Sequence, residues 1–511
     1  MNIFSKNITA LLFILIVFNT LLSAYWLLQK DIHYDVDVSR DFLVMDDIVR
    51  NHHFTLLGPR SGAIPGIFHG PLWFYINLPA FLIGGGNPLV VAWFWFFLSI
   101  IFLLIVFLVA KKLFDFKVAI FSALLLSVNS IVNPSIGLKN FYNPYGAVFL
   151  TPVFFWWFYQ YITTLKVKYL IFSLFTLGFI IQFQMAFGVP VLITITIFLL
   201  FFLFYKKRLY DCLAYFILVI PLMTFIIFDL RHNGLQFNAL VQFLGQHHGS
   251  AGIILNISDR VRAVFFDFFD FFSPGKNLLT VFFAIFFLTV ISILLKKSIY
   301  PQKKIYWLFI YLFFGFWIIS LFFQGGVGNY FWPFLPLLII IFSSFYNFLN
   351  KKIFMMVFIL VYLVNLYTGI LAITNFKSDI NKRGPHSWGF NLQVAKEIYM
   401  DAKEDFGYYT FSPDRFAYQQ RYAMIYAKKF FPNLNSYPST KKPNTYLIEV
   451  DPPKDRPELD SIGWRISEVG INRSPDQTFR FDFIQVEKYL LSDKEIKIPA
   501  NPLILDYMFV R

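Results

Sequence analysis

The sequence predicts an all-α polytopic membrane protein of about eleven transmembrane helices, followed by a soluble α/β domain. Of the 511 residues, 57% are hydrophobic and only 14% are charged, and the mean hydropathy is +0.59. Soluble domains carry roughly 25% charged residues, so one large water-soluble core is excluded. The composition changes after residue 375, where charged residues become frequent. We therefore expect a transmembrane domain over residues 1–375 and a separate domain over residues 376–511.

The apolar runs set the predicted spans, since a span needs about 20 mostly apolar residues. They lie near residues 8–28, 88–110, 118–135, 146–163, 169–187, 189–205, 212–229, 278–295, 305–323, 330–349 and 353–374. The first run could also be a cleaved signal peptide. It lacks a clear small-x-small cleavage site, and its length favours a span.

The basic residues indicate how these spans are oriented. The net charge is +14, but Lys and Arg gather in short clusters between the apolar runs. The clusters are Lys111-Lys112, Lys166 with Lys168, Lys206-Lys207-Arg208, Lys296-Lys297 with Lys303-Lys304, and Lys351-Lys352. Such clusters are typical of the cytoplasmic loops of membrane proteins. The positive charge therefore indicates a lipid bilayer as the partner and does not indicate nucleic acid. The protein is then expected in a cell membrane, and the segments outside the cytoplasm are 29–87, 133–145, 230–277, 324–329 and everything after Asn375.

The last 135 or so residues are long enough for an independent domain. Segments 392–402 and 413–430 are typical of helices, and segments 445–449 and 479–489 are typical of strands. No nucleotide-binding loop or Cys/His metal spacing occurs there, so the sequence does not assign this domain a role. The chain's single cysteine, Cys212, excludes an intramolecular disulfide.

Candidate reactive groups concentrate in the outer loops. The first loop contains Asp37-Val38-Ser39-Arg40-Asp41-Phe42, preceded by Asp35, and then Phe68-His69-Gly70-Pro71-Leu72-Trp73-Phe74-Tyr75. Asn140-Phe141-Tyr142-Asn143-Pro144 precedes the fourth span, and Gly328-Asn329-Tyr330-Phe331-Trp332-Pro333-Phe334-Leu335-Pro336-Leu337 opens a late one.

In this order and topology, the four motifs resemble those of the polyprenyl-phosphate-dependent glycosyltransferases of the GT-C fold. The similar group is the bacterial family-39, protein-mannosyltransferase and aminoarabinose-transferase-like group, and the resemblance covers roughly residues 8–375. Two positions depart from the family pattern. Val38 stands where the family has Glu, which leaves the choice between Asp35 and Asp37 open. Asn329 stands where the family has Arg, which removes a cation that could hold phosphate.

The resemblance implies transfer of a sugar from a polyprenyl-phosphate donor to a lipid, glycan or protein acceptor, with inversion. A carboxylate acting as general base contributes about 10²–10⁴-fold, and cationic or hydrogen-bonding groups stabilise the leaving phosphate. The resemblance gives the base role to Asp37, with Asp35 as its rival, and phosphate binding to Arg40, His69 and Tyr330. Further candidates are Asn143, Arg231 and His232.

Each of these residues also has a purely structural interpretation. Asp35 and Asp37 can be solvated turn carboxylates, and Arg40 can simply pair with Asp37 or Asp41. Tyr330 can be an interfacial aromatic. Arg231 and His232 sit at a span end, where charged groups can serve as anchors.

No metal or cofactor is predicted. His247-His248 has no acidic or Cys partner at ligand spacing.

Three other classes of protein share the polytopic pattern. A polysaccharide polymerase or ligase would typically rely on Arg and His in later loops. A transporter would show repeated halves, which are not visible here. An oligosaccharyltransferase normally has a Trp-Trp-Asp motif, whereas Trp156-Trp157 is followed by Phe158 within a span.

Overall fold

The computed structural model describes residues 6–62, 64, 66–131, 133, 141–245, 250–275, 278–297, 302–323 and 328–501. The chain divides into two compact units. The helical unit comprises Met1–Tyr25, Phe54–Asn77 and Phe94–Thr374. The sheet unit comprises Trp26–His53, Leu78–Trp93 and Asn375–Arg511. The sheet unit thus includes two early segments in addition to the residues after 375.

The described residues contain seven helices that are long and apolar enough to cross a membrane: Pro88–Leu113, Met185–Lys206, Leu209–Arg231, Leu278–Lys296, Gln302–Ser320, Gly328–Asn347 and Lys351–Thr374. By element they are α5 (Pro88–Leu113), α9 (Met185–Lys206), η1 (Leu209–Leu218) with α10 (Val219–Arg231), α13 (Leu278–Lys297), α14 (Gln302–Ser320), η4 (Gly328–Phe334) with α15 (Leu335–Ser344) and η5 (Phe345–Asn347), and α16 (Lys351–Thr374).

The other four predicted spans also coincide with helices: α1 (Lys6–Ser23), α6 (Phe116–Asn129), α7 (Pro144–Thr164) and α8 (Val167–Phe183). Three of them are apolar but shorter. The fourth, α7, is 21 residues long and carries Gln, Tyr and Thr near its C-terminal end. The predicted fold class, a polytopic helical membrane protein with a C-terminal sheet domain, is confirmed.

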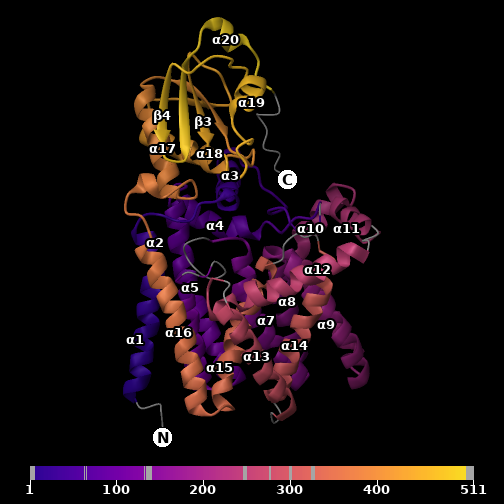
Figure 1. Ribbon diagram of the computed structural model, residues 1–511. Helices are drawn as coiled ribbons and strands as arrows, with labels where there is room; N and C mark the ends of the chain where they lie inside the picture. The colour runs from indigo at the N-terminus through magenta and orange to yellow at the C-terminus, as the bar shows by residue number, and fades with distance from the viewer. Residues whose placement is uncertain are drawn as a thin grey trace. The chain divides into compact units, whose positions relative to one another are not determined.

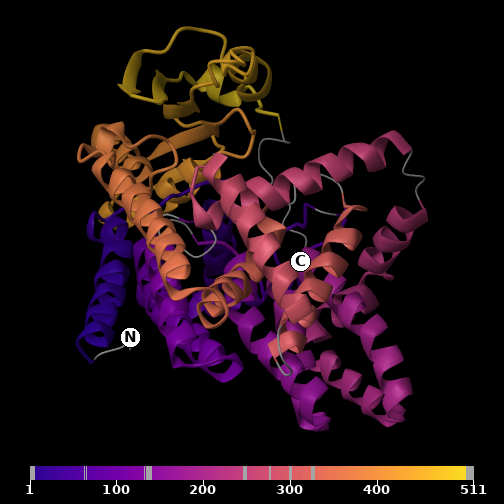
Figure 2. The ribbon, with the colours of Figure 1, turned by 60° about the horizontal axis from the view of Figure 1, so that its bottom comes forward.

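In the helical unit α7 packs against α8, α8 against α9, and α14 against both α9 and α13 (Figures 1 and 2). Two buried amides of the same unit bond to each other and to the backbone, which lowers the cost of placing them in an apolar surrounding. Asn129 of α6 donates from Nδ2 to Oδ1 of Asn365 of α16 at 2.8 Å. Nδ2 of Asn365 donates to the carbonyl of Phe271 at 3.0 Å. These buried amides fix α6 and α16 to the segment just before α13.

The predicted outer loops contain helices. The first holds α3 (Val36–Asn51) and α4 (Leu72–Ile83), while the short α2 (Tyr25–Leu28) ends the predicted first span. The long loop over residues 230–277 holds α11 (Leu235–Gly245), α12 (Ser250–Ala263), η2 (Val264–Phe268) and η3 (Phe269–Phe272). Helix α3 forms because Val38, Phe42, Met45 and Ile48 recur at helical spacing and are all buried. Hydropathy alone does not distinguish a charged helix such as α3 from a loop.

The sheet unit is built on a mixed five-stranded sheet in the order β2-β1-β3-β5-β4. Its strands are β1 (Phe406–Phe411), β2 (Ser436–Pro438), β3 (Asn444–Val450), β4 (Gln477–Phe481) and β5 (Ile484–Leu490). Strand β1 pairs in parallel with β2 and β3, while β5 pairs antiparallel with β3 and β4. The predicted single strand over residues 479–489 is wrong, because a turn divides it into β4 and β5.

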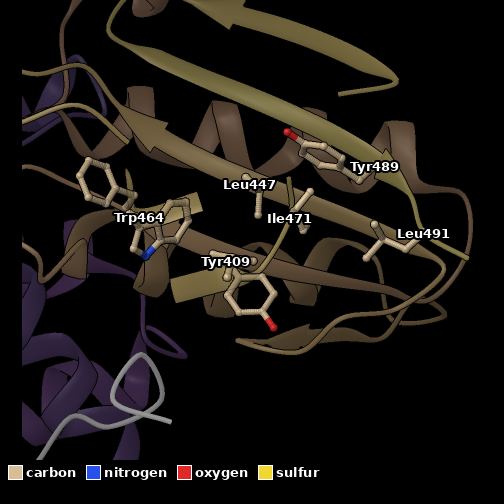
Figure 3. Packing of buried hydrophobic residues seen from close by; sticks show 8 residues of the cluster. Tyr409, Leu447, Trp464, Ile471, Tyr489 and Leu491 are labelled. Atoms are coloured by element: carbon tan, nitrogen blue, oxygen red, sulfur yellow. The ribbon is translucent and has the colours of Figure 1, made fainter. Parts of the chain in front are cut away.

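Helices α17 (Trp388–Ala402) and α18 (Tyr418–Ala427) accompany this sheet (Figure 1). The remaining short elements are η6 (Ile380–Lys382), η7 (Lys428–Phe430), α19 (Ile462–Trp464), η8 (Arg465–Val469) and α20 (Asp493–Lys497). A buried cluster lies between the sheet and the α19–η8 segment (Figure 3). It consists of Tyr409, Phe411, Leu447, Trp464, Val469, Ile471, Tyr489 and Leu491.

Asp31 attaches the early segment to the rest of the sheet unit. Its carboxylate is buried and accepts hydrogen bonds from the Ser387 hydroxyl at 2.7 Å and the Gly389 amide at 3.0 Å. The guanidinium of Arg383 lies 3.4 Å away. Losing one partner of such a buried ion pair typically costs about 3–5 kcal/mol, so this contact fixes the segment that leads into α3.

Candidate functional site

Asp35 caps helix α3. Its backbone is extended, and its Oδ1 accepts a hydrogen bond from the amide of Val38 at 3.0 Å. His33 Nε2 lies 3.8 Å from Oδ2 of the same carboxylate. A carboxylate at this position satisfies a free helix-terminal N–H and complements the helix dipole. Asp35 therefore has a structural role that accounts for its presence.

Asp37 lies two residues further on, in the first turn of α3, and 62% of its side chain is exposed. Arg40 Nη1 donates to Asp37 Oδ1 at 2.6 Å, while Nε and Nη2 donate to Asp41 Oδ1 at 3.0 and 2.7 Å. Burial disfavours the charged guanidinium, but Asp41 and Asp37 outweigh it and raise the pKa of Arg40. Arg40 is thus bound by two carboxylates, and Asp37 is the exposed member of the group. These contacts match the pairing interpretation of Arg40.

His69 is buried in the helical unit and fixes the start of α9. The amide of Met185, the first residue of α9, donates to His69 Nδ1 at 3.1 Å. A neutral imidazole in this arrangement carries its proton on Nε2. The next residue, Gly70, packs against Gln182, where an added Cβ would lie 1.7 Å from Oε1. The His-Gly pair of the first outer loop is therefore held against the junction of α8 and α9.

Asn143 reaches the same junction from α7. Its Nδ2 donates to the carbonyl of Phe183, the last residue of α8, at 2.8 Å. The structure thus brings His69 and Asn143 to the two sides of one helix break. Asn140, from the same motif, lies outside the described residues.

Arg231 and His232 end α10. Arg231 is exposed, and the ring of His232 stacks on Phe228 with centroids 4.1 Å apart. Asp229, nearby, accepts from the amide of Gln236 at 2.9 Å and so caps α11. These contacts match the anchoring interpretation of this span end. His247 and His248, further along, lie outside the described residues.

Tyr330 is buried in η4 and faces two segments of the helical unit. An added Cβ on Gly62 would lie 3.1 Å from its hydroxyl, so the first outer loop passes directly over it. Its second neighbour is Arg260 of α12, with which it interacts electrostatically.

Arg260 is the residue that sequence reasoning missed. Its side chain has no exposed surface. Nε donates to the carbonyl of Ser320 at 3.0 Å and Nη2 to that of Phe323 at 2.9 Å. Within the described part of the chain Nη1 has no hydrogen-bond partner. Burial lowers the pKa of Arg260, and Asp259 and Tyr330 oppose that effect. A buried guanidinium bonded only to carbonyls, with one donor open, is suited to an anion.

An apolar cavity of about 180 Å³ begins at the next residue along α12. Phenylalanines dominate its lining, which comes from α12, η2, η3, α13 and α14: Val261, Val264, Phe265, Phe268, Phe269, Phe287, Leu288, Phe309, Ile310, Phe313, Phe314 and Trp317. Arg260, the residue before Val261 in α12, is not among the lining residues.

Within the described ranges no group of three or more His, Cys, Asp or Glu side chains could hold a metal ion. Asp37 and Asp41 are bonded to Arg40, and Asp35 to the N-terminus of α3.

No known protein family and no curated protein matches the sequence. Among solved structures, the chain is similar to the crystal structure of ArnT from Cupriavidus metallidurans bound to undecaprenyl phosphate. The TM-score is 0.58 at 10% identity, over 96% of this chain and 99% of ArnT. The apo state of the same protein gives a TM-score of 0.57 at 10% identity, over 93% and 97% of the two chains.

These similarities define the class of structure to which the chain belongs. It is a multi-pass membrane protein with the GT-C fold, which confirms the resemblance seen in the four motifs at the level of the fold. In particular, the fold of ArnT extends through almost the whole length of this chain, C-terminal residues included.

Proposed function

We propose that the protein is a membrane glycosyltransferase that moves a sugar from a polyprenyl phosphate to an acceptor of the cell envelope. The observation that carries this proposal is the fully buried Arg260, which interacts electrostatically with Tyr330 and whose Nη1 has no partner among the described residues, in a chain with the fold of ArnT. A buried cation needs an anionic partner. The phosphate of a polyprenyl donor supplies one.

Arg260 and Tyr330 bind the phosphate in this proposal. A guanidinium stays charged and offers donors in a rigid fork that matches phosphate oxygens. Its carbonyl partners, Ser320 and Phe323, orient that fork without neutralising it. Arg260 thereby supplies the cation that Asn329 removes from the late motif. The tail follows the apolar cavity that starts at Val261.

Asp37 takes the base role. It removes the proton of the acceptor hydroxyl or amine as that group bonds to the anomeric carbon, while the bond from that carbon to the phosphate oxygen breaks. The polyprenyl phosphate leaves with the bonding electrons, and the configuration at the anomeric carbon inverts. Arg40 is a positioning residue that holds Asp37 in one orientation through the 2.6 Å bond. Acceptors of the lipid, glycan and protein classes all carry suitable nucleophiles.

The reaction takes place outside the cytoplasm in this proposal, because the Lys clusters lie at the opposite ends of the spans. A reporter fused after Asn375 is expected to be active only outside the cytoplasm. Activity of that reporter inside the cell would reverse the assignment of the two membrane faces.

The direct test is transfer by purified full-length protein in nanodiscs. The protein is mixed with a panel of polyprenyl-phosphate sugars and candidate acceptors, and the products are analysed by mass spectrometry. We expect saturable transfer from one class of donor, including in the presence of a chelator. Loss of transfer on chelation and its return with manganese or magnesium would favour an oligosaccharyltransferase-like mechanism. Movement of lipid between leaflets without any covalent product would identify a transporter.

A further inference from the structure

A second cavity lies in the helical unit, where α9 ends and α14 begins. Its volume is about 780 Å³, and residues of α7, α9 and α14 line it. This is within the range of about 300–1,000 Å³ that is typical of small-molecule sites. It is much larger than a bare phosphate ion needs.

Three lysines give this cavity its charge. Lys206 is the last residue of α9, and Lys303 and Lys304 lie in the first turn of α14. The lining residues, all within the described ranges, include no Asp or Glu. The nearest carboxylate in sequence, Asp211, is paired with Arg208 at 3.0 Å and accepts from the Tyr161 hydroxyl at 2.7 Å. The N-terminal end of α14 adds to the positive potential.

The walls of the cavity are apolar and aromatic. Phe198 and Phe202 of α9 line it together with Trp307 and Tyr311 of α14, and the rings of Phe198 and Tyr311 are in contact with centroids 5.7 Å apart. The Tyr311 hydroxyl is already occupied, since it donates to the carbonyl of Thr194 at 2.9 Å. Three cations above an aromatic wall match an amphiphile that has an anionic head and apolar chains.

This cavity is distinct from the Arg260 group. Arg260 bonds to the carbonyl of Ser320, the last residue of α14, whereas the lysines stand at the first turn of the same helix. The 19 residues of α14 span roughly 28 Å at about 1.5 Å per residue. The two cationic groups therefore lie at opposite ends of one candidate membrane span.

We infer that this cavity binds the phosphate headgroup of an anionic glycerophospholipid, with its acyl chains along Phe198, Phe202 and Trp307. Basic pockets between transmembrane helices on the cytoplasmic side bind such headgroups. The Lys clusters predict that this face is cytoplasmic. The site is independent of the glycosyltransferase proposal, because neither Arg260 nor Asp37 takes part in it.

The test is native mass spectrometry of the full-length protein with phosphatidylglycerol, phosphatidylcholine or inorganic phosphate as probe. We expect the wild-type protein to retain phosphatidylglycerol over phosphatidylcholine. Replacing Lys206, Lys303 and Lys304 together with Gln should weaken binding of phosphatidylglycerol by roughly a hundredfold. The reason is that each lysine near a membrane surface attracts anionic headgroups by a similar free energy, and three such contributions are lost.

The matched control is Lys111→Gln with Lys112→Gln, an exposed pair at the end of α5 that does not line the cavity. It should leave the lipid preference unchanged. An unchanged preference in the triple variant, or equal loss in the control, overturns the site. Inorganic phosphate that displaces phosphatidylglycerol at similar concentration overturns the lipid assignment. If the triple variant does not fold, Trp307→Ala tests the wall alone and should weaken binding of long-chain but not short-chain phosphatidylglycerol.

Discussion

Arg40 in the sheet unit and Arg260 in the helical unit are both largely removed from water, yet their partners differ in kind. Arg40 uses three N–H groups on the two carboxylates of Asp37 and Asp41. Arg260 uses Nε and Nη2 on the neutral carbonyls of Ser320 and Phe323, and its Nη1 has no partner among the described residues. Arg40 with its two carboxylates carries a net charge of about −1, whereas Arg260 with its two carbonyls carries about +1, which the adjacent Asp259 offsets in part. An arginine between carboxylates orients them, whereas one held by carbonyls keeps its charge for a ligand.

Replacing Asp37 tests the acidic half of this comparison and should give the largest effect. Asp37→Asn preserves size and most hydrogen bonding but removes the proton-accepting charge. We expect turnover to fall by at least about a hundredfold, while donor binding changes little. Steady-state kinetics with the donor found in the transfer assay measures both quantities.

Asp35→Asn is the internal control for that variant. Asn also caps helices well, so α3 should form and turnover should fall by less than about tenfold. If Asp35→Asn abolishes transfer and Asp37→Asn does not, the two carboxylates exchange roles. If neither matters in folded protein, the carboxylates of α3 are structural.

Replacing Arg260 tests the cationic half. Arg260→Gln removes the charge while leaving a side chain that can still reach a carbonyl. We expect kcat/KM for the donor to fall by roughly a hundredfold, because a hydrogen bond to a charged group is lost along with its charge. Arg260→Lys should recover part of that loss. Arg262→Gln, at an exposed position of the same helix, should behave like wild type; equal losses at positions 260 and 262 would exclude a specific phosphate role.

The Asp37–Arg40 group and Arg260 were not equally predictable from the sequence. Asp37 and Arg40 stand in a charged stretch between apolar runs, so composition and the family motif both point to them. Arg260 lies in Asp259-Arg260-Val261-Arg262, where nothing separates it from its exposed neighbour Arg262. A cation four residues before the Phe-rich segment 264–272 was the available signal. Its burial depends on the carbonyls of Ser320 and Phe323, some sixty residues away in the chain. Hydropathy located the spans because an apolar run is a local feature of the sequence. The hydrogen-bond partners of a loop residue, by contrast, lie far away in the chain.

Glu449 of β3 extends the comparison, because it is a third buried ionisable group and, like Arg260, has an atom without a partner among the described residues. Its Oε1 has no partner among the described residues, and Ser461 donates to Oε2 at 2.8 Å. Burial, followed by the charge of Glu487, raises the pKa of Glu449 from 4.5 to about 7. In Glu449 a bound proton, rather than a ligand, removes the need for a charged partner.

The sign of the resulting pH dependence follows from that shift. The folded state binds more protons than the unfolded state between the two pKa values, so stability falls as pH rises from about 4.5 through about 7. The full shift corresponds to about 3 kcal/mol, and an unpartnered amide in the variant offsets about 1 kcal/mol. Glu449→Gln should therefore be more stable than the wild-type sheet unit by about 2 kcal/mol at pH 8.5 and no more stable than it at pH 5. Hydrogen exchange of β3 and β5 in the full-length protein measures this, and a pH-independent difference would contradict it.

Arg40→Lys is the mildest change, and it distinguishes a positioning role of Arg40 from binding of the donor phosphate. Lysine keeps the positive charge but cannot bond Asp37 and Asp41 at once with the fixed fork of a guanidinium. If Arg40 is a positioning residue, Asp37 becomes mobile: kcat should fall by about tenfold while KM for the donor stays the same. If Arg40 instead binds the donor phosphate, KM should rise together with the fall in kcat. Arg50→Lys is the matched control, since Arg50 pairs with Asp46 at 2.8 Å one helix turn apart on the same α3. A lysine there should change neither constant, because that pair is remote in sequence from Asp37 and half-exposed.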